Sequence, residues 1–123
     1  MLSDTDRDLK TQLLAQAARL LLQYNESSAV IDAAMARTSQ ALGLKSCRVV
    51  VGYRSVSVSL DGHCPVVETV QELRLNAAVQ MRVHRILDQV QLAQVDAQSA
   101  LSALHRVEAD TPRHPQCLVA VLL

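Results

Sequence analysis

The residues best suited to chemistry are Glu26, Ser27 and Ser28, a carboxylate followed by two hydroxyls directly before a predicted helix. Ser27 or Ser28 is expected to cap that helix, and the free backbone N–H groups at a helix start bind carboxylates well. An amino acid or a dicarboxylate is therefore one class of ligand for this turn. Helix capping explains the same residues without a ligand, and both interpretations stay open at this point.

Three further polar residues flank the predicted sheet and the start of the helix after it. Arg54, Arg74 and Asn76 would add cationic and amide contacts to a bound carboxylate. The alternative for all three is an ordinary solvated surface. A speculative ligand site therefore consists of Glu26, Ser27, Ser28, Arg54, Arg74 and Asn76.

Nucleophilic catalysis would need a histidine beside the same turn. Ser27 or Ser28 with His84 or His105 would form a dyad only if folding happened to bring them together, and the chain has no Gly-x-Ser-x-Gly nucleophile elbow. The sequence therefore predicts no catalytic residue, and a small hydrolase is kept only as a minor alternative.

Histidine and cysteine occur together at two places, His63 with Cys64 and His114 with Cys117, while Cys47 stands alone. The cysteines lack the paired short spacings of structural zinc sites, and no His-Glu-x-x-His helix is present. We predict no metal and no cofactor. Reduced thiols are the simplest interpretation of three cysteines in this chain.

Length and composition set further limits. With 123 residues the chain has room for one modest core, and because Trp and Phe are absent that core must consist of Leu, Val, Ile and Ala. Twelve basic residues balance twelve acidic ones, and aromatic residues are scarce. No nucleic-acid partner is expected, since such binding relies on excess positive charge and on base stacking.

Four segments of the chain have the periodicity of an amphipathic helix. Helices are predicted over residues 4–24, from Ser27 or Ser28 to the Gly43 stop, over residues 75–91, and from an Asp96 cap to about residue 110. In the third helix the expected buried stripe is Leu75, Val79, Val83, Ile86 and Val90.

Between these helix pairs, residues 47–70 switch to strand alternation. One apolar face is expected from Cys47, Val49, Val51 and Tyr53, and a second from Val56, Val58 and Leu60. An Asp61-Gly62 hairpin turn leads to a third strand over residues 66–70. Such a sheet must be covered, and we expect the rest of the chain to be organised around it, with helices from both sides of the sequence as cover.

The predicted fold class is therefore α+β: two helices, a small three-stranded antiparallel sheet, two helices and an apolar C-terminal segment. Residues 1–111 would form the soluble N-terminal domain. Residues 112–123 would form a Pro-containing hinge and either the start of a transmembrane helix or a final buried strand, since Val and Leu suit both. Arg106, Arg113 and His114 favour a cytoplasmic domain if a membrane helix follows.

This order of elements resembles the N-terminal region of the threonine/serine exporter family, bacterial membrane proteins in which such a domain precedes a bundle of transmembrane helices. The matching stretches are residues 20–28 (LLLQYNESS), 34–37 (AMAR), 41–44 (ALGL) and 56–60 (VSVSL), then Ala100, Leu104 and His114-Pro115. The resemblance covers nearly the whole chain. Each motif alone has low specificity, so the resemblance lies in the order and spacing of the motifs.

The resemblance implies a domain on the cytoplasmic side of the bacterial inner membrane, with a membrane-embedded transport domain or subunit as its partner. Its role would be to gate or assemble the efflux of threonine, serine or a related small carboxylate, and it would not be an enzyme. The alternative from another class is an interaction module without a ligand, which forms a homo-oligomer through the sheet edge or an apolar helix face.

Overall fold

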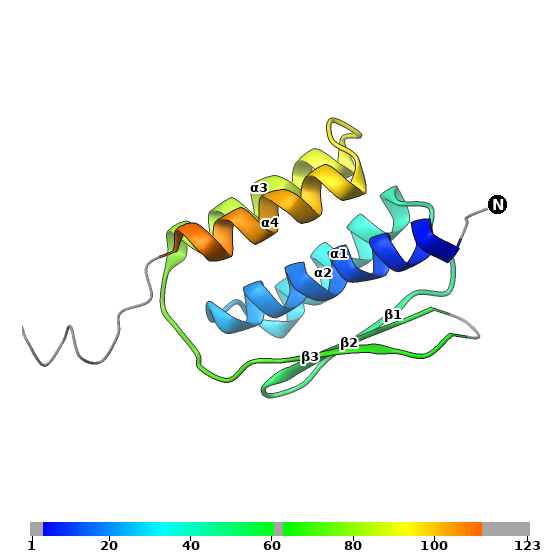
Figure 1. The fold of residues 1–123 in the computed structure, drawn as a ribbon. Coiled ribbons are helices and arrows are strands. Elements are labelled where there is room, and N and C mark those ends of the chain that lie inside the picture. The colour runs from blue at the N-terminus through cyan, green and yellow to red at the C-terminus, as the bar shows by residue number, and fades with distance from the viewer. Residues whose placement is uncertain (1–3, 61–62, 112–123) are drawn as a thin grey trace, which may run out of the picture.

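The computed structural model describes residues 4–60 and 63–111. Its elements follow in the order α1 (Asp4–Gln23), α2 (Ser28–Ala41), β1 (Arg48–Val51), β2 (Ser55–Ser59), β3 (Val66–Thr69), α3 (Ala77–Gln91) and α4 (Ala97–Asp110). The predicted α+β class and the order of helices and strands are confirmed. Figure 1 shows three layers, with α3 and α4 above α1 and α2 and the sheet below.

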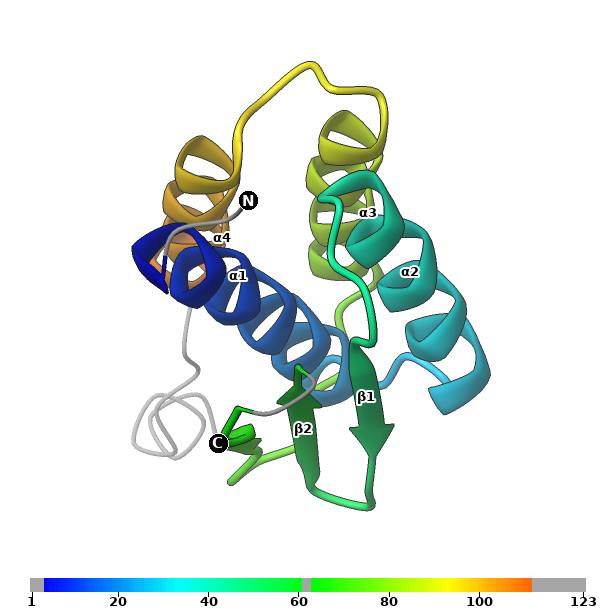
Figure 2. The ribbon, with the colours of Figure 1, turned by 90° about the vertical axis from the view of Figure 1, so that its right-hand side faces the viewer.

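The organising element is α1, not the sheet. This helix contacts α2, α3, α4, β2 and β3, whereas α3 and α4 pack mainly on the other helices. Figure 2 shows α1 between α4 and the sheet, with α2 and α3 beside it. The expectation that helices from both sides of the sequence cover the sheet was therefore wrong for α3 and α4. From Leu13 to Leu22 this helix is apolar around most of its circumference, which is typical of a buried helix. The buried residues of α1 are Thr11, Leu13, Leu14, Ala15, Ala17, Ala18, Leu20, Leu21 and Leu22.

The sheet is antiparallel with the order β1-β2-β3. Val56 and Val58 are fully buried against the helices, as the alternation predicts. On the outer face Val50, Ser57 and Val67 form one cross-strand row. Because none of the helices α1 to α4 covers that face, Val50 and Val67 are 54% and 56% exposed among the described residues.

Two residues predicted to be on buried faces lie outside them. Tyr53 is 82% exposed because β1 ends at Val51 and the chain turns, with the Gly52 N–H donating to the Ser55 carbonyl at 2.7 Å. Leu75 is 85% exposed because Asn76 caps α3, so the helix begins after it. The rest of the predicted α3 stripe is buried.

Three helices end in a left-handed residue that turns the chain. Gly43 at φ 74° ends α2 as the sequence predicts, and Asn25 at φ 69° follows the end of α1. Ala93 at φ 57° ends α3 in the same way, and the Gln94 N–H donates to the Gln89 carbonyl at 2.8 Å. The Asp61-Gly62 turn and the segment 112–123 lie outside the described residues.

Candidate functional site

The α1–α2 turn packs against the start of α3 at one end of the molecule. We call this contact the turn–α3 junction and define it as residues 23–28 together with residues 74–84. The Arg74 N–H donates to the Gln23 carbonyl at 2.7 Å, and the Gln80 amide donates to the Tyr24 carbonyl. The last carbonyls of α1 have no partner inside the helix, so these bonds satisfy them and hold the two segments together.

An imidazole–carboxylate pair lies at the centre of the junction. His84 Nε2 is 2.9 Å from Glu26 Oε2, while Glu26 Oε1 accepts a hydrogen bond from the Ser27 N–H at 3.1 Å. The two side chains are largely shielded, with 29% of His84 and 17% of Glu26 exposed. The pair therefore links the α1–α2 turn to α3 with both carboxylate oxygens in use.

Two of the predicted ligand residues are helix caps. The Ser27 hydroxyl accepts from the Val30 N–H at 3.3 Å. The Asn76 side-chain oxygen accepts from the N–H groups of Ala78 and Val79 at 3.1 and 3.3 Å. Ser28 is the exposed first residue of α2. The start of α2 and the start of α3 thus lie beside the same turn, each with a capped first turn.

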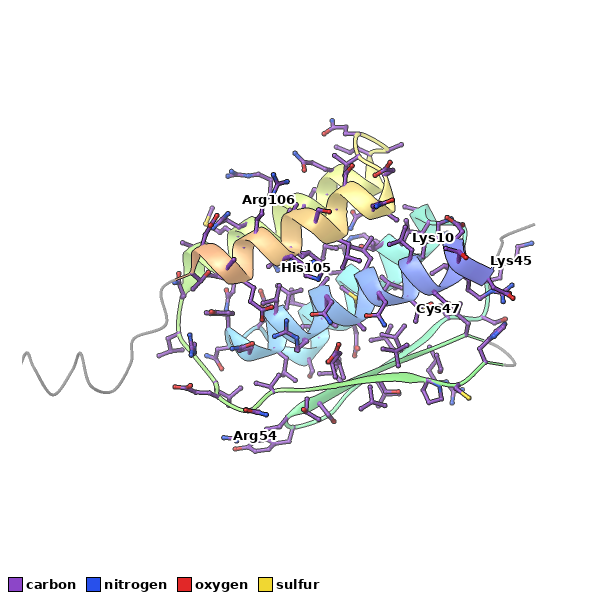
Figure 3. The ribbon with its side chains drawn as sticks, viewed as in Figure 1. Lys10, Lys45, Cys47, Arg54, His105 and Arg106 are labelled. Carbon is purple, nitrogen blue, oxygen red and sulfur yellow. The ribbon has the colours of Figure 1, made fainter. Side chains whose placement is uncertain are left out.

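The two predicted arginines occupy different places. Arg54 lies at the tip of the β1–β2 hairpin (Figure 3), where its guanidinium donates to the Gln71 carbonyl at 3.1 Å. Arg74 belongs to the junction and pairs with Glu72 at 3.3 Å. Burial alone would lower the pKa of Arg74, but hydrogen bonding and charge attraction from Glu72, followed by those from Tyr24, outweigh burial and raise it.

Arg74 also lines a polar hollow of about 330 Å³ between α1, β3 and α4. At its wall the Arg19 guanidinium donates to the side-chain oxygens of Gln16 and Gln23 and pairs with Glu108 at 2.7 Å. Only 12% of the Arg19 side chain is exposed. The Arg19–Glu108 pair at this wall is therefore a cross-link between α1 and α4.

The structure therefore gathers Glu26, Ser27, Ser28, Arg74 and Asn76 at the junction and places Arg54 on the neighbouring hairpin. Sequence reasoning missed Gln80, and it considered His84 only as a possible dyad partner of Ser27 or Ser28. The sequence signal for both residues is a row of polar side chains beside the apolar stripe of α3. This polar row continues to Gln91, whose amide donates to the Thr38 hydroxyl at 3.1 Å. The ligand role of the six predicted residues stays a prediction.

The hydrolase alternative needs a histidine bonded to a serine. His84 bonds instead to the Glu26 carboxylate, and the Ser27 hydroxyl is occupied by the cap of α2. His105 is exposed on α4. The imidazole of His84 therefore bonds to a carboxylate, whereas an activated serine nucleophile would need its hydroxyl bonded to the imidazole.

Cysteine chemistry has little support among the positioned residues. Cys47 is half-buried, and burial raises the pKa of its thiol, which keeps it protonated and unreactive at neutral pH. In the described part of the chain, no three His, Cys, Asp or Glu side chains group closely enough to hold a metal ion. The His114 and Cys117 pair lies outside the described residues.

The order of elements and the helix-rich α+β architecture are those implied by the resemblance to the domain of a membrane transport protein. The family model of the threonine/serine exporters (ThrE) matches residues 12–123. The chain belongs to the threonine/serine exporter family. No curated protein and no solved structure matches the chain. Of the helices formed by residues 4–60 and 63–111, none combines the length and apolar character needed to cross a bilayer.

Proposed function

We propose that this chain is the cytoplasmic N-terminal domain of a threonine/serine exporter-like transporter in the bacterial inner membrane, where it gates or assembles the efflux of a small amino acid or carboxylate. Family membership supports the transport context. The proposal includes residues 1–111 as the domain and residues 112–123 as a hinge and the start of a membrane helix. Its partner is a membrane-embedded transport domain or subunit.

The observation that carries the proposal is the linkage between the end of α4 and the turn–α3 junction. Asp110 at the end of α4 lies 3.7 Å from Arg82 on α3, and Glu108 pairs with Arg19 on α1. Arg19 in turn holds Gln23, whose carbonyl accepts from Arg74 at the junction. A shift of the chain that follows Thr111 would therefore reach α1, α3 and the junction through direct contacts, as a gating domain requires.

We propose that the junction takes the small amino acid or dicarboxylate. Two helix N-termini, those of α2 and α3, lie beside it, and their partial positive charge favours a carboxylate. Arg74 would supply the cation, with Glu26, Ser27, Ser28 and Asn76 as polar contacts and Arg54 on the neighbouring hairpin. Binding would require Ser27 or Asn76 to share its capping role with the ligand.

The test is an efflux assay on the natural gene that contains this chain, expressed with its membrane-embedded part. Cells loaded with labelled threonine should export it, and deletion of residues 4–111 should abolish export while membrane insertion of the remainder persists. The substitution Arg82→Gln, which removes the contact with Asp110, should slow efflux, and Arg85→Gln on the exposed side of α3 is the control. Unchanged efflux in the deletion variant would exclude a gating or assembly role.

A second candidate is the interaction module that dimerises without a ligand. It is favoured by the open outer face of the sheet, where Val50 and Val67 are exposed, and by the two edge strands β1 and β3. Light scattering after size exclusion separates the candidates. A stable dimer that Val67→Lys converts to a monomer, with no effect of threonine on thermal stability, would favour the module.

A further inference from the structure

Exposed apolar side chains gather on two adjacent loops, the β1–β2 turn and the segment between β3 and α3. Tyr53 is 82% exposed on the first loop, and Leu73 and Leu75 are 40% and 85% exposed on the second. Arg54 and Arg74 alternate with them along the sequence. We call Tyr53, Arg54, Leu73, Arg74 and Leu75 the hairpin-end patch.

Internal hydrogen bonds hold both loops in place. The Val70 N–H donates to the Arg54 carbonyl at 2.7 Å, and the Arg54 guanidinium donates to the Gln71 carbonyl, so the second loop is tied to the hairpin. The Arg74 N–H ties the same loop to the end of α1. The patch is thus a preformed surface, which lowers the entropy that binding would cost.

The second loop of the patch leads to the end of the molecule at which α4 ends. Figure 1 shows the start of α3 and the end of α4 at one end and the α3–α4 loop at the other, and it shows the segment between β3 and α3 running from the sheet layer, which holds the hairpin turn, to the first of these ends. The contact of Arg82 with Asp110 confirms that the start of α3 and the end of α4 are neighbours. The twelve residues after Thr111, seven of which form the apolar run 117–123, therefore begin at this end.

We infer that the hairpin-end patch is the surface that the domain places on the lipid bilayer. The inference rests on the proposed function, because that function puts the membrane on the side where α4 ends. Leu73 and Leu75 would enter the boundary between headgroups and acyl chains, and Tyr53 would take the interfacial position that its apolar ring and polar hydroxyl favour. Arg54 would reach lipid phosphates.

The charge of Arg54 suits this role. Its guanidinium lies 5.9 Å from the Tyr53 ring centroid and bonds to a carbonyl, and among the described residues it forms no ion pair. An arginine whose stem follows apolar surface keeps its charged head at the headgroup level. Two leucines and one tyrosine give weak binding alone, so the patch would act as a second contact beside a membrane anchor.

The absence of tryptophan from the chain makes insertion directly measurable. Leu75→Trp places a single fluorophore in the patch. Leu92→Trp places one on a matched exposed leucine, 68% exposed, at the opposite end of α3. With vesicles of phosphatidylcholine and phosphatidylglycerol, the fluorescence of the Leu75→Trp protein should shift to the blue and be quenched by brominated acyl chains. The Leu92→Trp protein should show neither change. Equal quenching at both positions, or at neither, would overturn the inference.

Vesicle co-sedimentation of the full chain gives the second measurement. The double variant Leu73→Ser/Leu75→Ser should bind about tenfold more weakly, because it removes about 1.4 kcal/mol or more of apolar transfer energy. Leu92→Ser should bind like the wild type. Arg54→Gln should weaken binding to anionic vesicles only, with a smaller effect at high salt. Circular dichroism of each variant checks that the fold is intact.

Two further outcomes would also overturn the inference, and both leave the proposed function standing. If the double variant bound vesicles as tightly as the wild type, another segment, such as residues 117–123, would make the lipid contact. A change of oligomeric state in the double variant would assign the patch to self-association. Conversely, unchanged efflux in the deletion variant together with patch-dependent vesicle binding would remove the proposed function and retain the lipid contact.

Discussion

His84 and Glu26, 58 positions apart in the sequence, meet at 2.9 Å and connect α3 to the α1–α2 turn. The carboxylate also accepts from the Ser27 N–H, at the residue that caps α2. One partly shielded pair therefore fixes the relative positions of three helices. Its loss would loosen the end of the molecule at which the proposed ligand site and the end of α4 both lie.

A double-mutant cycle on this pair is the first prediction. Glu26→Gln and His84→Gln should each lower the free energy of unfolding, and their coupling energy should be about 1 kcal/mol, since the pair is largely but not fully buried. Urea denaturation of the wild type, both single variants and the double variant gives the value. A coupling energy near zero would mean that the contact is only one of several arrangements in solution.

Helix capping by Asp96 makes stability depend on pH. Its carboxylate accepts from the Ser99 N–H at 2.7 Å, and this bond, with a further contribution from the Ser99 side chain, lowers the pKa of Asp96. A carboxyl whose pKa is lower in the folded state adds stability above its unfolded pKa. That contribution is lost as pH falls through the folded pKa, because the unfolded chain takes up the proton first.

The expected result is a smaller loss of stability on acidification in Asp96→Asn than in the wild type. Asparagine keeps the cap but carries no titrating group, so the two proteins should differ most near neutral pH and converge in acid. Denaturant titrations at a series of pH values below 7 measure this difference. Parallel pH profiles for the two proteins would contradict the role of the Asp96 charge.

Local signals made the helix ends predictable, whereas contacts between distant segments were not. Ser27, Asp96 and Gly43 act on backbone groups a few residues away, so their types suffice to predict them. The periodicity of Leu75 suits a helix, but the side-chain oxygen of Asn76 accepts from the first free N–H groups, so α3 starts at Ala77, two residues later than predicted. Similarly, the alternation of residues 47–53 does not show where Gly52 bends the chain and turns Tyr53 outward.

The same reasoning applies to the candidate site. The sequence identified Glu26 and Ser27 because a carboxylate and a hydroxyl at a helix start have a local meaning. It gave no means of pairing Glu26 with His84, since that contact depends on how α3 packs against α2. The central position of α1 was also hidden, because an apolar helix pattern does not say how many neighbours will cover it.

The left-handed residue that ends α3 gives a stabilising substitution. Ala93 has φ 57°, a conformation that costs a residue with a side chain about 1 kcal/mol more than glycine. Ala93→Gly should therefore raise the free energy of unfolding by up to about 1 kcal/mol. Gly43→Ala is the reverse substitution at the end of α2 and should lower the free energy of unfolding by about 1 kcal/mol. Nothing lies within 4 Å of the added methyl group, so this loss comes from the backbone conformation and not from a steric clash. Thermal and urea unfolding should move in opposite directions in the two variants.

Arg19 provides the strictest test of the cross-link between α1 and α4. Its guanidinium uses Nε, Nη1 and Nη2 on three side chains, those of Gln16, Gln23 and Glu108. Arg19→Ala should cost about 2 kcal/mol, because Glu108 would lose its partner but can turn toward water, being 38% exposed. Arg19→Lys should recover only part of the loss, since an ammonium cannot reproduce the planar fork. Arg37→Ala on the exposed face of α2 is the control and should change stability by less than about 0.5 kcal/mol. If lysine restored full stability, the interaction would be simple charge attraction, and the three-sided geometry of the guanidinium would contribute nothing to holding α4 in place.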